Sequence, residues 1–79
     1  MNLKSLSDKI LIENTERLVQ TERETLTSIL YHFKEIERRR LYSAHGYKSL
    51  ADFTIRKLKY SEYEAYARIK AMRLLEDLS

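Results

Sequence analysis

Apolar residues recur at helical spacing along most of the chain, and they define the elements that we expect. A first helix is predicted to begin after Ser5 or Ser7 and to carry one broad apolar side, formed by Leu3, Leu6, Ile10, Leu11 and Leu18. A second helix is predicted to begin at Thr21, because Thr21 and Glu24 have the spacing of a capping box. Its apolar side consists of Leu26, Ile29, Leu30, Phe33 and Ile36.

The chain after residue 40 predicts a stop and a third, short helix. Gly46 predicts that the second helix ends near Ala44 or His45, because glycine adopts the left-handed cap conformation without steric cost. The third helix is expected to begin at Ser49, with Asp52 in the capping-box position. Its apolar residues are Leu50, Phe53 and Leu58.

A fourth helix is predicted after a short turn, with Ser61 as its cap and Glu64 at its third position. Two such helices joined by a three-residue break have the layout of a helix-turn-helix, although helical hairpins without a nucleic-acid role share it. Lys59 stands where the turn usually has a small residue, which predicts a strained backbone or a different turn. We therefore expect a single all-α domain over residues 1–79, a bundle of about four helices with a helix-turn-helix-like hairpin at about 49–78.

The fourth helix carries two apolar lines. The inward line is predicted to contain Ala65, Tyr66, Ile69 and Met72, and the offset line contains Tyr63, Ala67, Leu74 and Leu78. A short helix with two apolar sides normally packs against two partners. The second partner would be the first helix, another copy of the chain or a following domain.

Composition narrows the function classes. The 79 residues include no Cys and no Pro, which excludes disulfides, thiolate zinc sites and cysteine nucleophiles. No apolar run approaches the roughly 18–20 residues of a membrane span, and the N-terminus lacks the apolar core of a signal peptide. These features predict a cytoplasmic protein with no membrane partner.

Charge is distributed unevenly around the net value of +3. Residues 1–37 hold seven acidic and five basic side chains, whereas residues 38–75 hold ten basic and three acidic ones and so carry +7. Such an asymmetry creates a directional field that helps a small domain to find a polyanion. Solvated helix faces are the alternative explanation.

The basic second half supplies the candidate nucleic-acid-binding residues. Arg38 and Arg39 are predicted to point off the apolar stripe and to be free to meet phosphate, whereas Glu37 and Arg40 fall on that stripe and can pair. Glu62 and Glu64 would repel phosphates in the first turn of the last helix, which favours backbone contacts over base reading. The candidates are Arg38, Arg39, Arg56, Lys57, Lys59, Arg68, Lys70 and Arg73.

Catalytic chemistry finds no support in the sequence. His32 and His45 have no companion carboxylate at metal-ligand spacing, and the chain has no glycine-rich phosphate loop and no nucleophile–base pair. We expect no enzyme activity, no metal, no cofactor and no small-molecule substrate. The six tyrosines are explained by helix packing or by stacking on single-stranded bases.

Four stretches carry a resemblance to a known family: 36–42, 46–53, 58–62 and 65–75. Together with the opening residues 3–8, they resemble the N-terminal helical region of bacterial HNH endonuclease-like proteins. The likeness covers nearly the whole chain, although Lys59 replaces the glycine that is usual in the family. The resemblance implies a DNA-associated role without a catalytic residue, because the nuclease motif of that family lies in a separate domain. We expect a stand-alone module or an excised domain.

Two functions remain open. The first is a DNA-binding helical module that contacts mainly phosphates, acting alone or as the targeting domain of an HNH-type nuclease, with DNA favoured over RNA. The second is a helical dimerisation or docking module in which the basic patch is incidental, and a homodimer fits both. A phage or defence-related protein that blocks a nucleic-acid enzyme is a third reading.

Overall fold

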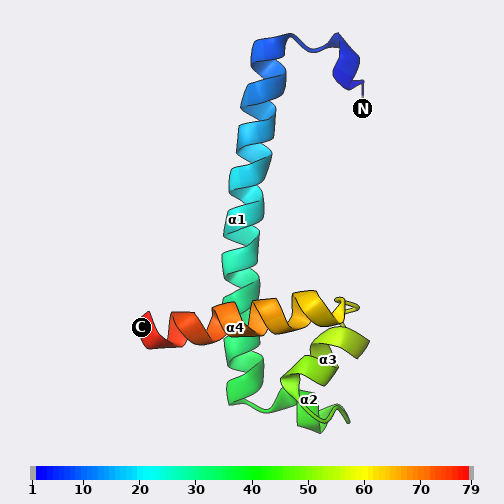
Figure 1. Cartoon of the computed structure of the whole chain (residues 1–79), viewed down its shortest axis with the longest axis vertical. Helices are drawn as coiled ribbons and strands as arrows, with labels where there is room; N and C mark the ends of the chain where they lie inside the picture. The colour runs from blue at the N-terminus through cyan, green and yellow to red at the C-terminus, as the bar shows by residue number, and fades with distance from the viewer. Residues whose placement is uncertain (1, 79) are drawn as a thin grey trace.

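The computed structural model describes residues 2–78, with side chains described as far as residue 75. It contains the 3-10 turn η1 (Leu3–Ser5) and the helices α1 (Asp8–Arg38), α2 (Leu41–Ala44), α3 (Leu50–Arg56) and α4 (Glu62–Leu78), with no strand in this range. Figure 1 shows α1 as one long rod, with α2 and α3 near its C-terminal end and α4 crossing it there. The all-α fold is confirmed, and no helix among these residues is long and apolar enough to cross a membrane.

Helix α1 is continuous, so the predicted break at Thr21 is wrong. Ser7 caps the helix by accepting a hydrogen bond from the Ile10 N–H at 3.3 Å, as expected from one of the two predicted starts. The Thr21 hydroxyl donates to the Arg17 carbonyl at 3.0 Å and therefore does not cap a new helix. Residues 8–38 contain no glycine or proline that would interrupt the helix.

The end of α1 comes earlier than the sequence predicts. The helix ends at Arg38, and Arg40 adopts a left-handed conformation with φ of 52°, so that only the four-residue α2 continues to Ala44. The predicted stop at Gly46 is confirmed, with φ of 86°. Tyr42 packs against the core after the bend at Arg40. A straight continuation of α1 would place Tyr42 beyond the core.

Helix α3 begins as predicted but ends sooner. The Ser49 hydroxyl accepts from the Asp52 N–H at 3.0 Å, and the Asp52 carboxylate accepts from the Lys48 N–H at 3.0 Å. The helix ends at Arg56, so Leu58 lies in the turn and is exposed, contrary to its predicted place in the helix. The turn itself forces Lys59 to φ of 66°, the strained conformation that the missing glycine predicts.

Helix α4 begins with the predicted capping box. The Ser61 hydroxyl accepts from the Glu64 N–H at 3.1 Å, and the Glu64 carboxylate accepts from the Ser61 N–H at 3.2 Å. The bond from the Ser61 N–H, followed by the side-chain bond between the same residues, lowers the pKa of Glu64. These two bonds satisfy donors that the first turn of a helix otherwise leaves unpaired.

The core lies where α4 crosses α1. Its buried apolar residues come from α1, α3 and α4: Leu30, Phe33, Leu50, Ile69 and Met72. Ala65 is fully buried, and its small side chain allows the helices to approach closely. Buried Thr54 donates its hydroxyl to the Leu50 carbonyl at 2.8 Å, so that it leaves no unpaired polar group.

One apolar line on α4 differs from the prediction. Ala65, Ile69 and Met72 face the core as expected, but Tyr66 is more than half exposed because it lies about 90° from the centre of that line on a helical wheel. Tyr63 and Leu74, from the offset line, are also exposed. The side chain of Leu78 lies outside the described residues.

Candidate nucleic-acid interface

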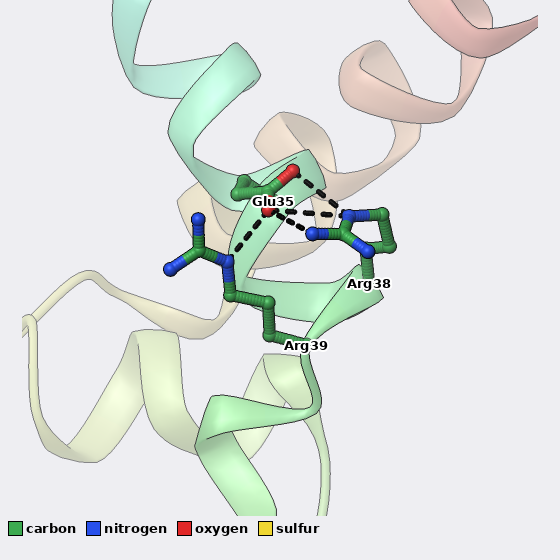
Figure 2. A network of polar contacts seen from close by, with 3 residues as sticks. All are labelled: Glu35, Arg38 and Arg39. Atoms are coloured by element: carbon green, nitrogen blue, oxygen red, sulfur yellow. Dashed lines mark hydrogen bonds and ion pairs between the residues drawn. The ribbon is translucent and has the colours of Figure 1, made fainter.

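Two of the candidate cations lie at the end of α1 and are both bound to one carboxylate. Arg38 donates through Nε and Nη2 to Glu35, at 3.0 Å and 2.5 Å for its closest contacts, and Arg39 Nε donates to Glu35 Oε2 at 2.6 Å (Figure 2). The prediction that both arginines are free to meet phosphate is therefore wrong. Both remain exposed, but Glu35 neutralises one of their two charges.

The same contacts change the titration of the carboxylate. Hydrogen bonds from Arg38 and then from Arg39 lower the pKa of Glu35 from 4.5 to about 2, and the bond with Glu35 raises the pKa of Arg38. A pKa that is lower in the folded state stabilises the fold above pH 4.5, and this contribution is lost as the pH falls towards 2. Solvent screens the effect because all three side chains are exposed.

We expect this carboxylate to titrate well below its usual range. In an NMR titration of the side-chain carboxyl carbons, Glu35 should reach its midpoint at about 2. Replacing Arg38 by Ala should move the Glu35 midpoint upwards, because the largest cause of the shift is removed. An unshifted Glu35 midpoint in the unaltered protein would contradict the observed pairing.

A third arginine joins two helices. Arg73 on α4 makes a two-pronged contact with Glu37 on α1, with Nη1–Oε1 and Nη2–Oε2 distances of 3.0 Å each. This contact replaces the pair with Arg40 that helical spacing allows. Parallel guanidinium–carboxylate bonds hold both groups in one orientation. Arg73 therefore connects α4 to α1, and a ligand would have to compete with Glu37 for it.

Two further candidates have local partners. Arg56 Nη1 lies 3.5 Å from Asp52 Oδ2, and its guanidinium carbon lies 5.3 Å from the centre of the Tyr47 ring, within the range of a cation–π contact. Arg68 is half-buried and attracts the Glu64 carboxylate one turn earlier on α4. Both guanidinium groups are therefore partly engaged within the hairpin.

The remaining candidates are lysines that lack such partners. Lys57 and Lys59 lie in the turn between α3 and α4, and Lys70 lies on the outer side of α4. All three are exposed, and none forms an ion pair with a residue that the structure describes. These lysines can meet an anion without first breaking a contact.

A groove beside α4 brings additional groups together. It has a volume of about 680 Å³ and is lined by Lys48, Lys70 and Arg73 and, as the one acidic residue among those that the structure describes, by Glu37. Tyr42 and Tyr66 also line it. Lys48 was not among the predicted site residues, although its place directly before the Ser49 cap of α3 could have indicated a fixed position.

The eight candidates therefore do not form one cluster. Arg38 and Arg39 gather on Glu35 at the end of α1, whereas the other six belong to the hairpin of α3 and α4. Within residues 2–78, no group of three or more His, Asp and Glu side chains is placed to hold a metal ion. His32 lies with Nδ1 2.6 Å from the Ser28 carbonyl, one turn back on its own helix.

Comparisons with known proteins identify no relative of this chain. No protein-family model, no curated protein and no solved structure matches it. The resemblance to HNH endonuclease-like proteins thus stays a prediction from the residues, and function is argued from the site alone.

Proposed function

We propose that this chain binds double-stranded DNA through the hairpin of α3 and α4, mainly by contacts with phosphates. The observation that carries the proposal is the set of cations on the hairpin and its groove that have no acidic partner among the described residues. This set consists of Lys48, Lys57, Lys59 and Lys70.

The contrast with the arginines supports this choice. Arg38, Arg39 and Arg73 each hold a carboxylate, and a phosphate would have to compete with it. An exposed lysine without a carboxylate partner exchanges only its counterions and water for phosphate, and the release of counterions from DNA drives binding. The hairpin lysines are therefore the main contacts, and the arginines have a secondary role.

The acidic start of α4 sets the mode of binding. Glu62 and Glu64 lie in its first turn, and Glu64 is held by the Ser61 cap. Carboxylates at the tip of a helix repel phosphates and accept hydrogen bonds from few base edges. Backbone contacts without strong sequence preference fit this arrangement better than base reading does.

A duplex titration at two salt concentrations tests the proposal. Four phosphate contacts predict a log–log slope of about −3.6, so that raising the salt from 50 to 200 mM should weaken binding about a hundredfold. Fluorescence anisotropy with a labelled 20-base-pair DNA of mixed sequence measures both affinities, and an RNA duplex of the same sequence compares the two nucleic acids.

A single substitution sharpens the same experiment. Lys70→Ala should reduce the steepness of the salt slope by about 1, because one phosphate contact is removed. Lys9→Ala, which removes a lysine paired with Glu13 near the start of α1, should leave the slope unchanged. Absence of binding at 50 mM salt, or affinity that does not depend on salt, would contradict the proposal.

The resemblance supplies a setting for this activity. In HNH endonuclease-like proteins the cutting domain is separate from the helical region, so a chain of this kind would act as the DNA-targeting part of such a nuclease. In that setting the hairpin contributes affinity for the duplex, and the nuclease domain contributes the reaction.

A further inference from the structure

The first half of α1 stands apart from the rest of the molecule. With 31 residues, the helix is about 46 Å long, and α2, α3 and α4 lie towards its C-terminal end, whereas η1 lies near its start (Figure 1). Leu3 of η1 lines a shallow pocket with Leu11 and Leu18. The radius of gyration is 16.8 Å, compared with about 12 Å for a compact domain of this length. The chain is therefore unusually extended.

This isolated half carries an exposed apolar stripe, formed by Leu11, Ile12, Leu18 and Val19. On a helical wheel these residues fall in the same sector, about 120° wide, as the part of α1 that packs against α3 and α4. The residues of that packed part are Leu26, Ile29, Leu30, Phe33 and Ile36. Near the end of α1 this side packs against α3 and α4. Over residues 11–19, near its start, the same side is exposed.

The chain exposes more surface than a compact protein of its mass. The chain exposes 6548 Å², whereas a compact monomer of its mass exposes about 5,000 Å². The excess of about 1,500 Å² is polar and apolar surface of the whole extended chain, and the stripe is part of it. Contiguous exposed apolar residues of this kind favour association over exposure to water.

We infer that a second copy of this chain covers the stripe, with the two α1 helices antiparallel. The position of α4 selects this orientation, because α4 packs on the same side of α1 further along. A parallel copy would place its own α4 in the space that the first α4 occupies. An antiparallel copy places the two groups of α2, α3 and α4 at opposite ends.

The sequence of the stripe is compatible with a two-fold axis at Thr15. An axis there places Leu11 of one copy level with Val19 of the other, and Ile12 level with Leu18, so that apolar residues meet over the central part of the stripe. Asp8 and Glu22 lie in the same sector beyond it and come level with each other, and salt screens this repulsion. The Thr15 hydroxyl already donates to the Leu11 carbonyl at 2.8 Å, and it can be buried at the axis without losing a partner. The contact is isologous, as in most homodimers.

The two edges of the stripe set its salt dependence. One edge carries the uncharged residues Ser7, Asn14 and Thr21, and an antiparallel copy presents the same edge to it. The other edge carries Glu16, which lies within one turn of its equivalent across the axis. It also carries Lys9 and Arg23, and the axis brings Lys9 of one copy within one turn of Arg23 of the other. Association should therefore strengthen as salt rises, the opposite of the dependence expected for DNA binding.

Sedimentation velocity over 5–500 µM in 0.3 M salt tests the dimer. We expect the mass to rise with concentration from 9.5 kDa towards twice that value. Leu18→Glu should raise the dissociation constant at least tenfold, and it should not unfold the monomer because Leu18 is 68% exposed there. Ile10→Glu is the matched control: Ile10 is 41% exposed but lies about 140° from the centre of the stripe, so its replacement should have a much smaller effect.

Cysteine cross-linking tests the orientation in a chain that has no cysteine of its own. Thr15→Cys should form a disulfide-linked dimer on mild oxidation, whereas Ile10→Cys should not. Ile12→Cys alone should form little disulfide-linked dimer, but it should cross-link when it is mixed with Leu18→Cys.

Three outcomes would overturn the inference. The first is a monomer at every concentration, which would leave the stripe to a different partner. The second is an equal effect of Leu18→Glu and Ile10→Glu, and the third is efficient cross-linking of Ile12→Cys alone, which indicates a parallel pair. None of them bears on DNA binding by the hairpin, which the salt titration measures separately.

Discussion

Phe33→Ala is expected to remove about 3–5 kcal/mol from the free energy of unfolding, the usual cost of deleting a buried aromatic ring. Phe33 is only 2% exposed, and its ring meets the edge of Tyr60 at a centroid distance of 6.3 Å. Folded chains have roughly 0.05–0.15 kcal/mol of stability per residue, which is about 4–12 kcal/mol here. One substitution should therefore remove much of the stability of the domain.

Urea unfolding followed by circular dichroism, at one fixed protein concentration, measures this loss. Tyr63→Ala is the control, because Tyr63 is an aromatic residue that is 84% exposed on α4, and its truncation should change stability by less than about 0.5 kcal/mol. Similar effects of the two substitutions would mean that the crossing of α1 and α4 does not form the core. In that case the site on the hairpin would lack its support.

Local signals allowed the caps to be predicted. The contacts of Ser49 with Asp52 and of Ser61 with Glu64 join residues three apart, so the sequence alone contains both partners. Thr21 and Glu24 have the same spacing but lie inside α1, where the threonine hydroxyl bonds to the preceding turn. Capping-box spacing shows that a helix can begin at a residue. It does not show whether the preceding residues are already helical, as they are before Thr21.

The bend at Arg40 could not be read from the sequence. Nothing in the local residues predicts a left-handed conformation for an arginine. The packing of Tyr42 against the core compensates for its cost. The pair of Glu37 and Arg73 depends in the same way on the crossing of α1 and α4, because its members are 36 residues apart. Such contacts become visible only when the fold is known.

The partners of Arg38 and Arg39 could have been predicted. Glu35 lies three and four residues before them, the spacing at which side chains on a helix meet. When the charges are summed from residue 38 onwards, Arg38 and Arg39 are counted but their partner Glu35 is not. The sum therefore overstates the positive charge that these arginines offer to a phosphate. Counting charges by helical neighbours leaves the hairpin lysines as the main positive surface.

Reversing the hairpin lysines is expected to weaken DNA binding by at least about a hundredfold at 0.1 M salt. Each phosphate contact contributes roughly 1 kcal/mol through released counterions, which is about fivefold in Kd. Replacing Lys57, Lys59 and Lys70 by Glu removes three contacts and adds repulsion. The three side chains are exposed, so the fold should persist, and circular dichroism checks this.

A matched variant separates local charge from net charge. Replacing Lys4, Lys9 and Arg17 by Glu also reverses three cations, so both variants fall by six units from +3 to −3. These three residues lie on η1 and the isolated half of α1, away from the hairpin (Figure 1). If binding depended on the overall field alone, the two variants would weaken it equally, because long-range attraction follows the total charge. A loss confined to the hairpin variant would instead assign the phosphate contacts to α4 and to the turn before it.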